Sequence, residues 1–313
     1  MPELPEVHTT ATMLHKLTKG LVIKDVWTDY NSAYHAGKDN IKDPRFFKKF
    51  RQAVIGKKIS GVSRRGKNVL IDLDDRETIV VHMKMTGHLL YGQYRKIRNP
   101  KFENRKTWEP EEKEGPLGDP FNQHIHFVVT FSNGKHLALS DMRKFAKVTL
   151  VRSVKAHETS HLKNIGPEPL DKNFTYQVFL ARLALRPYGK IKQVLMDQSV
   201  IAGIGNIYSD EILWATGVHP ESAVLKIPAE IRRSGFRLMK EILSKGIDLG
   251  GDSMSDYRNP LGLRGKFQYH HKAYRNTGKP CQKKGCRGTI AKIKMNGRHA
   301  HFCPKHQKEF AII

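Results

Sequence analysis

The chain has 313 residues, a length that holds two domains of ordinary size, each with its own core. Lysine and arginine number 55 and aspartate and glutamate 30, so the formal net charge is +25, which attracts polyanions. These features argue against a membrane protein, because the longest apolar runs, such as the one around Val80, are too short to cross a bilayer and no basic amphipathic helix or lipidation signal is present.

A helix is predicted at the N-terminus. Val7, Ala11, Leu14 and Leu17 recur at spacings of four, three and three, and Gly20 follows where a helix often ends. The first residues, MPELPEV, carry two glutamates and no apolar stretch, which argues against a secretory signal. We therefore expect a soluble, cytoplasmic protein, at the nucleoid if the source is bacterial.

Short β-rich segments follow the helix. Their alternating patterns, and turns such as SNGK, predict an antiparallel sandwich or barrel. The expected strands lie within 21–30, 57–65, 68–73, 78–85, 124–131, 135–141 and 146–151. Residues 92–122 interrupt the pattern with a charged stretch rich in proline and glycine, which predicts a surface insertion between two strands.

The second half of the chain has a different character. Apolar periodicity predicts helices after about residue 152. These are expected at 174–186, 190–197, 206–216 and 228–245. Two prolines in NIGPEPL, at 164–170, exclude regular structure there and mark the entry to a domain. Frequent glycines from Gly250 to Gly265 predict a flexible loop, and 281–306 predicts a metal-bound hairpin.

Positive charge is concentrated near the C-terminus. Between Tyr257 and Lys308 there are 14 lysine or arginine residues and no acidic residue. A solvated surface normally mixes both signs, so this segment predicts contact with a polyanion. Nucleic acid is the expected partner.

The cysteines of the chain are Cys281, Cys286 and Cys303, and His306 follows closely. An odd number near one end argues against a disulfide framework and favours metal in a reducing compartment. Two close pairs separated by a hairpin can converge on one tetrahedral zinc ion, and four protein ligands make such a site structural. His299 and His301 are alternatives for the fourth ligand.

Pro2 follows the initiator methionine, and a small second residue usually permits removal of Met1. The amine then exposed has a pKa of about 8, against about 10.4 for lysine, so more of it is unprotonated at neutral pH and able to attack an aldehyde-level carbon. Glu3 and Glu6 lie beside it and can move protons. Taken alone, these residues fit better a capped first helix with proline and glutamate in its first turn.

Six blocks of sequence stand in one order along the chain and are followed by the terminal finger. The blocks are MPELPEV, SRRGKNVL, HMKMTGHL, SDMRKF, NIGPEPL and LMDQSVIAGIGNIYSDEIL. Together they resemble the formamidopyrimidine-DNA glycosylase (Fpg/Nei) family over essentially the whole chain except 92–122. Leu4 is typical of the Fpg branch, because the Nei branch typically has glycine there.

The resemblance implies a bifunctional DNA glycosylase and AP lyase. In such enzymes the N-terminal proline, here Pro2, attacks the sugar C1′ and displaces the base, while the next glutamate, here Glu3, protonates the ring oxygen. Glu6 resembles its partner in that region, and the iminium allows both phosphates to leave by β,δ-elimination. Lys67 resembles a lysine that contacts phosphate beside the lesion, although without the family it fits an ordinary turn lysine.

Chemistry on a base also requires the base to leave the stack, and the vacated space must be filled. Met85, Arg143 and Phe145 match the family's three inserted residues: an apolar plug, a donor for the orphaned base and a wedge. A methionine or phenylalanine near a strand is otherwise more often core. The family usually has Asp-Pro-Arg-Arg-Phe, whereas this chain has Asp-Met-Arg-Lys-Phe from Asp141 to Phe145.

Other residues match positions that contact phosphate. Gly203 and Gly205 let backbone amides approach an anion, and Asn206 opens the next helix at its positive end. This block resembles the family's helix–two-turn–helix element. His124 and Arg298 match further phosphate-contacting positions.

The finger departs from the family's usual four cysteines with two residues inside each pair. Here the first pair, Cys281 and Cys286, is wider, and the last ligand is His306. Residues 252–267 fall where the family has its base-capping loop.

We therefore expect an α+β protein that binds damaged duplex DNA as a monomer, in a positively charged cleft between two domains, with one structural zinc. The expected parts are a catalytic β-rich domain at 1–152, a helical DNA-binding domain at 153–250, a capping loop and linker at 251–280, and a zinc finger at 281–313. The expected lesions are oxidised purines, 8-oxoguanine or formamidopyrimidines. Alternatives are a Nei-like enzyme for oxidised pyrimidines and a non-catalytic zinc-ribbon DNA-binding protein.

Overall fold

The structure is a computed structural model that describes all residues except 100–101, 154–158, 160–161 and 313. The chain divides into two compact units. Unit 1 comprises Met1–Lys163 and Gly250–Lys266, and unit 2 comprises Asn164–Leu249 and Phe267–Ile313. Residues 250–266 therefore pack with the N-terminal half of the chain, although they follow the predicted helices in sequence.

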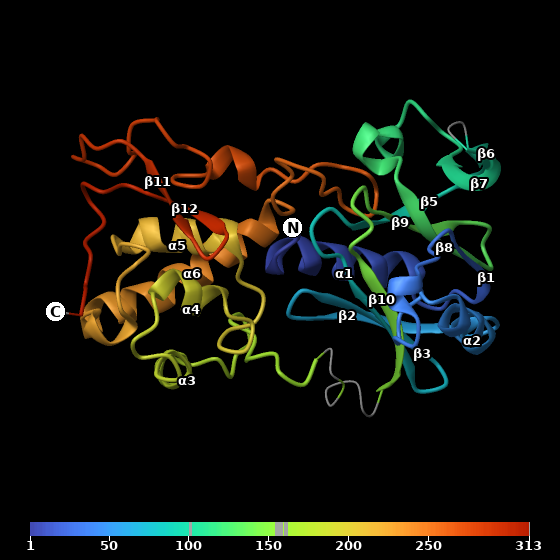
Figure 1. Ribbon diagram of the computed structural model, residues 1–313, viewed down its shortest axis with the longest axis horizontal. Helices are drawn as coiled ribbons and strands as arrows, with labels where there is room; N and C mark the ends of the chain where they lie inside the picture. Colours follow the sequence, from blue (N-terminus) through green and yellow to red (C-terminus); the bar gives the residue numbers. More distant parts are fainter. Residues whose placement is uncertain (100–101, 154–158, 160–161, 313) are drawn as a thin grey trace. The chain divides into compact units, whose positions relative to one another are not determined.

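Unit 1 contains two four-stranded antiparallel sheets (Figure 1). One sheet has the order β1–β8–β9–β5, and the other has the order β10–β4–β3–β2. Their strands are β1 (Ile23–Thr28), β2 (Ile59–Arg65), β3 (Asn68–Leu73), β4 (Glu77–His82), β5 (His88–Gly92), β8 (Ile125–Phe131), β9 (His136–Ser140) and β10 (Lys147–Arg152). The expected antiparallel sheets are thus confirmed, as two separate sheets, and the described residues form no closed barrel.

One apolar core joins the two sheets to the first helix. Helix α1 (Leu4–Thr18) buries Val7, Ala11 and Leu14, the face that the periodicity predicts. The same core includes Ile71 of β3 and Phe127 of β8, one from each sheet. Full burial of side chains of this size stabilises by roughly 1.5–3 kcal/mol each, so α1 is fixed within unit 1.

Helix α2 and strand β5 of unit 1 are among the elements that lie outside the predicted set. Helix α2 (Pro44–Val54) begins after Asp43, whose carboxylate accepts the amide of Arg45 at 2.8 Å. An Asp N-cap followed by proline is a start signal that the sequence does carry. Strand β5 is short and pairs only with β9 within its sheet.

The insertion at 92–122 has secondary structure of its own. It contains a hairpin of β6 (Tyr94–Asn99) and β7 (Phe102–Pro110), then two short 3-10 helices, Pro116–Gly118 and Pro120–Asn122. Trp108 of β7 meets Trp27 of β1 edge to face at 6.2 Å between ring centroids. The insertion is therefore packed onto the first sheet.

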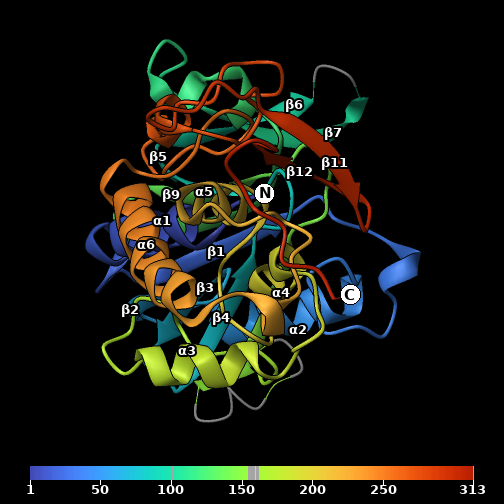
Figure 2. The same ribbon diagram turned by 90° about the vertical axis from the view of Figure 1, so that its left-hand side faces the viewer.

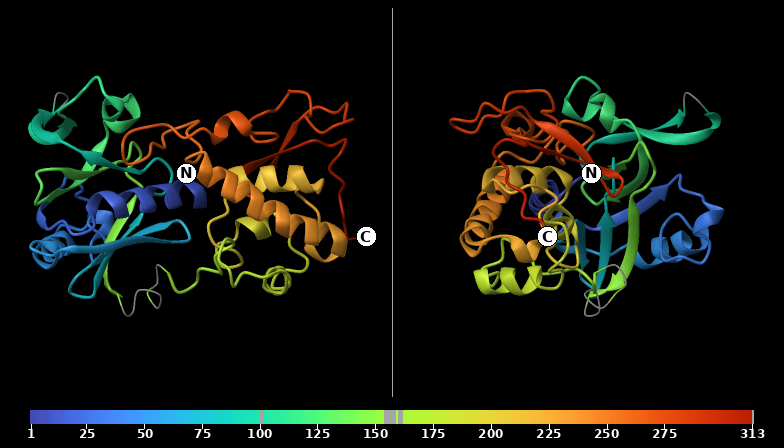
Figure 3. Two further views of the ribbon diagram at one scale, coloured as in Figure 1. Left: turned by 180° about the vertical axis from the view of Figure 1, so that it is seen from behind. Right: turned by 60° about the vertical axis from the view of Figure 1, so that its left-hand side comes forward.

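Unit 2 contains the predicted helices and the terminal hairpin. They are α3 (Tyr176–Leu183), α4 (Ile191–Met196), α5 (Asn206–Thr216), α6 (Ala229–Asp248), β11 (Ala291–Met295) and β12 (Arg298–Phe302). Helix α6 packs along α5, and β12 contacts α5 as well (Figures 2 and 3). No helix among the described residues combines the length and the apolar composition needed to cross a bilayer.

Candidate active site and DNA-contacting residues

The start of α1 is a buried cluster of carboxylates. Glu3 is the N-cap: its side chain accepts the backbone N–H of Glu6, and its own N–H donates to Glu6 Oε2 at 2.7 Å. Glu3 and Glu6 are 2% and 1% exposed, and Pro2 is buried. The sequence motif therefore does form a capping box, and this box fixes the positions of the residues assigned to catalysis.

Glu6 also holds a segment distant in sequence. Its Oε1 accepts the N–H of Asp252 at 2.7 Å. Gly251, with φ of +86°, has no room for a side chain, because a Cβ there would lie 2.8 Å from Glu6 Cγ. Burial, and then the charge of Glu3, raise the pKa of Glu6 to about 7. Protonated and ionised forms of Glu6 therefore coexist near neutral pH.

The start of the chain lies within electrostatic reach of these groups. Burial lowers the pKa of the Met1 amine below its usual value. The carboxylates of Glu3, Glu6 and Asp256 act in the opposite direction, and Lys67 lowers the pKa further. A lowered pKa leaves more of a terminal amine unprotonated, which is the form that acts as a nucleophile.

Lys67 lies in the tight turn between β2 and β3, next to Gly66 with φ of +56°. It is only 6% exposed, whereas an ordinary turn lysine lies in water. Its charge is also felt by His82 of β4, whose pKa falls to about 3 because of burial first and then the cations Lys84 and Lys67. The charge of Lys67 therefore acts on the amine at the chain start, and its contact with a phosphate beside the lesion stays a prediction.

Met85, Arg143 and Phe145 lie on two loops of unit 1 and are exposed. Met85 is 40% and Phe145 47% exposed, and the Arg143 guanidinium lies 4.5 Å from the centroid of the Phe145 ring. These side chains are therefore not core residues.

Asp141 and Thr86 tie the two loops together. Thr86 Oγ1 donates to Asp141 Oδ1, and the Arg143 N–H donates to Thr86 Oγ1 at 3.1 Å. Asp141 Oδ2 also accepts the N–H of Ala146 at 2.7 Å. These hydrogen bonds fix the spacing between Met85 and the loop that carries Arg143 and Phe145.

The loop lacks the family's proline, and other contacts constrain it. Lys144 has a left-handed conformation with φ of +56°. The buried Lys42 donates its amine to the carbonyl of Lys144, and the Lys144 amine lies 3.5 Å from Asp29. Lys42 is a supporting residue that the motifs do not reveal, because it precedes the loop by 102 residues.

His124 is exposed and lies just before β8. Its carbonyl accepts the N–H of Asp141 at 2.8 Å. The backbone at His124 is therefore joined to the same loop that presents Arg143 and Phe145.

In unit 2, Asn206 is the first residue of α5, after the N-cap Gly205. The preceding turn is held by Gln198, which accepts the N–H of Gly203 at 2.8 Å and donates to the carbonyl of Ile204 at 2.8 Å. Asn206 Oδ1 is buried and has no hydrogen-bond partner among the described residues. Backbone N–H groups at a helix start favour an anion, and the phosphate cradle expected at this turn stays a prediction.

The four predicted zinc ligands meet in unit 2. The ligand atoms of Cys281, Cys286, Cys303 and His306 all lie within 4.8 Å of one another. Cys281 Sγ is 3.2 Å from His306 Nδ1, and Cys286 Sγ is 3.7 Å from Cys303 Sγ. Three thiolates and one imidazole at this separation hold one structural zinc ion.

His306 lies in the cluster with the three cysteines, and its ring is oriented towards them. Its Nε2 donates to the carbonyl of Trp214 at 2.9 Å, which leaves Nδ1 unprotonated and directed at the thiols. His301 instead donates to Asp210 at 2.9 Å, and His299 is exposed on the hairpin. Arg298 is also exposed, at the start of β12.

A buried charge network connects the finger to α5, and no motif predicts it. Asp210 of α5 pairs with Lys192 of α4 and accepts both the N–H and the ring N–H of His301. Lys192 and Asp210 are each 1% exposed. The sequence carries part of this information. Two consecutive acidic residues, Asp210 and Glu211, in the middle of an apolar helix indicate that they have buried partners, but they do not indicate which residues these partners are.

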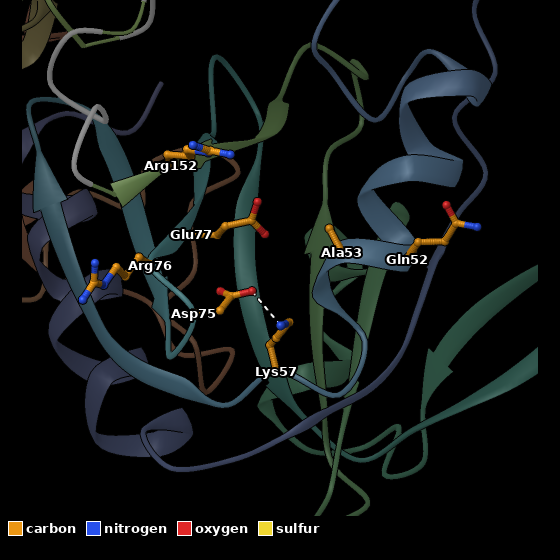
Figure 4. A pocket seen from close by; sticks show the side chains of 7 residues that line it. All are labelled: Gln52, Ala53, Lys57, Asp75, Arg76, Glu77 and Arg152. Carbon is orange, nitrogen blue, oxygen red and sulfur yellow. Dashed lines mark ion pairs between the residues drawn. The ribbon is translucent and has the colours of Figure 1, made fainter.

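A surface hollow of about 600 Å³ in unit 1 contains none of the predicted site residues (Figure 4). Its lining is Gln52, Ala53, Lys57, Asp75, Arg76, Glu77 and Arg152. Lys57 pairs with Asp75 at 2.8 Å inside it. The hollow is lined by both acidic and basic side chains, some of which already form an ion pair. We therefore assign the reaction site to the cluster at the start of α1 and not to this hollow.

Known families match the chain in three consecutive parts. The profile of the formamidopyrimidine-DNA glycosylase N-terminal domain matches residues 1–148, and that of the formamidopyrimidine-DNA glycosylase H2TH domain matches 165–258. The profile described as a zinc finger found in FPG and IleRS matches 278–305.

Similar proteins cover the chain almost completely. A formamidopyrimidine-DNA glycosylase of Streptococcus pyogenes is 36% identical over 315 residues, covering 99% of each chain. The Lactococcus lactis Fpg solved with DNA containing an abasic site has a TM-score of 0.78 at 30% identity, covering 96% of this chain and 98% of that one. A mutant of the Lactococcus lactis protein solved with DNA containing Fapy-dG has a TM-score of 0.78 at 31% identity, covering 97% and 98%.

Proposed function

The chain belongs to the formamidopyrimidine-DNA glycosylase family, and on this premise we propose that it excises oxidised purines from duplex DNA and cleaves the strand at the abasic site. The lesions are 8-oxoguanine and formamidopyrimidines. The observation that carries the proposal is the buried capping box of Glu3 and Glu6 at the start of α1, next to Pro2; the charges of Glu3, Glu6 and Lys67 also act on the Met1 amine that precedes Pro2. This is the set that an amine nucleophile needs: proton donors and a cation for the adjacent phosphate.

The reaction begins once Met1 has been removed. The Pro2 nitrogen attacks C1′ of the damaged nucleotide, and the bond from C1′ to the base breaks as the base takes the electron pair and a proton. Glu3 delivers a proton to the ring oxygen, which opens the sugar and leaves an iminium between C1′ and the Pro2 nitrogen. Loss of a C2′ proton expels the 3′ phosphate, a second elimination expels the 5′ phosphate, and water then releases Pro2.

The remaining assigned residues hold the DNA. Met85, Arg143 and Phe145 fill the space left by the flipped nucleotide, because they are exposed and their loops are fixed by hydrogen bonds. Phosphates are contacted by Lys67 beside the lesion and by His124, Asn206 and Arg298 elsewhere. The structural zinc presents Arg298 and takes part in no chemical step.

The compartment follows from the chemistry of the partner and of the metal site. An enzyme that acts on DNA works where DNA is, and three zinc-binding thiols require reducing conditions. We infer a cytoplasmic protein on this basis.

Borohydride trapping tests the chemistry. The wild type, mixed with a duplex containing one 8-oxoguanine, is expected to yield a covalent DNA adduct at the N-terminal peptide, with Met1 absent from its intact mass. Pro2→Gly and Glu3→Gln are expected to reduce base excision by at least about 100-fold. Glu241→Gln, an exposed glutamate of α6, is the matched control. Absence of any adduct, or full excision by both variants, contradicts the mechanism.

Two alternatives are distinguished by the same reagents. A panel of duplexes with single lesions separates a preference for oxidised purines from a Nei-like preference for oxidised pyrimidines. A chain that retains Met1 and binds DNA without cleaving it would instead be a zinc-ribbon binding protein.

A further inference from the structure

We propose that Asp119, which the 92–122 insertion supplies, is a positioning residue for base excision. It pairs with the buried Arg258 and thereby holds residues 250–266 folded against the start of α1 before DNA binds. The inference rests on the proposed function, because the placement of this segment matters to catalysis only if the reaction occurs at that end of α1.

The ion pair between Asp119 and Arg258 is buried and has two contacts. Arg258 Nε is 2.9 Å from Asp119 Oδ2, and Arg258 Nη2 is 3.2 Å from Asp119 Oδ1. The Arg258 side chain is fully buried, and that of Asp119 is 18% exposed. Burial alone raises the pKa of Asp119, but hydrogen bonds from Arg258 and the Phe121 amide outweigh it and lower the pKa below its usual value. Fork-to-fork pairing of this kind fixes orientation as well as distance.

The rest of the guanidinium organises the segment around it. Nη1 of Arg258 donates to the carbonyls of Ser255 and Tyr257, each at 2.9 Å. The guanidinium also lies 4.8 Å from the centroid of the Phe121 ring, which belongs to the insertion. A buried guanidinium needs a counter-charge, so without Asp119 this arrangement loses its main support.

The same segment reaches the catalytic cluster at its other end. Asp252 N–H donates to Glu6, and the Tyr257 hydroxyl donates to the Glu6 carbonyl at 3.0 Å. Tyr257 Oη also lies 3.3 Å from Thr10 Oγ1. Tyr257 is adjacent to Arg258, so the insertion and the start of α1 are connected through two neighbouring residues.

Backbone contacts join the tip of the segment to the rest of unit 1. The N–H of Tyr91 in β5 donates to the carbonyl of Pro260 at 2.7 Å. Gly262 has φ of +80°, and a Cβ there would lie 2.5 Å from the carbonyl oxygen of Pro116 in the insertion. Figure 3 shows the segment, in orange, reaching the green insertion.

Glycine-rich composition predicts a flexible segment, whereas these contacts give it one folded conformation. Its apolar side chains Met254, Leu261 and Leu263 nevertheless remain 41%, 41% and 47% exposed. A loop that is ordered in advance does not lose its conformational entropy when it covers a ligand. The insertion therefore orders, before DNA binds, the surface that meets the extruded base. Base removal depends on this ordering more than strand cleavage does at a site that has already lost its base.

The test compares wild type with Asp119→Asn in three measurements on the full-length protein. Amide hydrogen exchange of residues 252–266 in the free protein is expected to quicken by at least about tenfold. Single-turnover excision of 8-oxoguanine is expected to slow by about tenfold or more, since small misplacements of a positioned group cost that much. Cleavage of a duplex with a pre-formed abasic site is expected to change less than about twofold, because no base needs covering.

A second variant and a control complete the design. Gly262→Ala disturbs the contact with Pro116 without removing a charge and is expected to reproduce the pattern, so the test stands even if Asp119→Asn folds poorly. Glu109→Gln, in the partly exposed ion pairs with Arg95 and Lys113 on the same insertion, is expected to match wild type. Unchanged exchange in 252–266, or equal losses of excision and abasic-site cleavage, would overturn the inference. If exchange is unchanged in Asp119→Asn while the wild type forms a normal borohydride adduct, the role of Asp119 is refuted and the proposed function stands. If the wild type forms no adduct, the proposed function is refuted.

Discussion

The two ends of the chain carry its two functional clusters, and different forces hold them. At the start of α1, Glu6 is buried and accepts amide hydrogen bonds from Glu3 and Asp252, so that cluster is held by the protein's own groups. Near the C-terminus, Cys303 and His306 belong to a set of four ligands that converge on zinc. The first cluster is therefore sensitive to protonation and the second to metal, and the two dependences are separable by experiment.

Removal of zinc is expected to have the largest effect, and only in unit 2. Structural zinc contributes about 10–16 kcal/mol in finger peptides, so Cys303→Ser or a strong chelator unfolds the terminal hairpin. Zinc content is expected to fall from one ion per chain, and DNA affinity to weaken in a fluorescence anisotropy titration. Hydrogen exchange in α1 is expected to stay unchanged. His299→Ala is the matched control, and a Cys303→Ser protein with one tightly bound zinc would contradict the ligand set.

Asp210→Asn tests whether the finger has support besides zinc. The substitution leaves Lys192 buried with a neutral partner and weakens the contact with His301. Breaking a buried pair in this way costs about 3–5 kcal/mol, which urea unfolding of unit 2 measures. Arg237→Gln, in an exposed pair on α6, is expected to cause little change. Similar small changes in both variants would show that zinc alone holds the hairpin.

The variant Glu6→Gln tests whether the cluster at the start of α1 makes the stability of the protein depend on pH. Because the pKa of Glu6 is raised to about 7, the unfolded chain ionises at lower pH than the folded protein does. The contribution of Glu6 to the free energy of unfolding is fully present below about pH 4.5 and falls as the pH rises towards 7. Above pH 7 this contribution is smaller by about 3 kcal/mol. Urea unfolding across pH 4 to 8 is expected to show this decline in wild type and not in Glu6→Gln. An identical decline in both proteins would assign it elsewhere.

Lys42→Met is expected to have the smallest effect. The loss of the hydrogen bond to the Lys144 carbonyl costs about 1 kcal/mol, and faster hydrogen exchange is expected in residues 141–146. Lys38→Met removes an exposed lysine nearby and serves as the control. Unchanged exchange in the loop would show that Asp141 suffices to fix Arg143 and Phe145 without the family's proline.

The elements and the metal ligands were predictable because their signals are local. Apolar spacing gives the buried face of α1, and helix α5 begins at Asn206 as expected. The spacing of the cysteines and His306 within one hairpin was enough to predict a zinc site. Each of these signals lies within about thirty residues, where periodicity and turn residues determine structure directly.

Sequence by itself therefore determined most of the helices and strands, the three cysteines that bind zinc together with a nearby histidine, and the block at the start of the chain. Tertiary structure alone decided the strand order, the choice of His306 over His301, and the contacts that complete the catalytic cluster. Glu6 meets Asp252 across 246 residues and Arg258 meets Asp119 across 139, distances over which no local pattern operates. Buried charges must find partners, but which partner they find depends on how the folded elements approach one another.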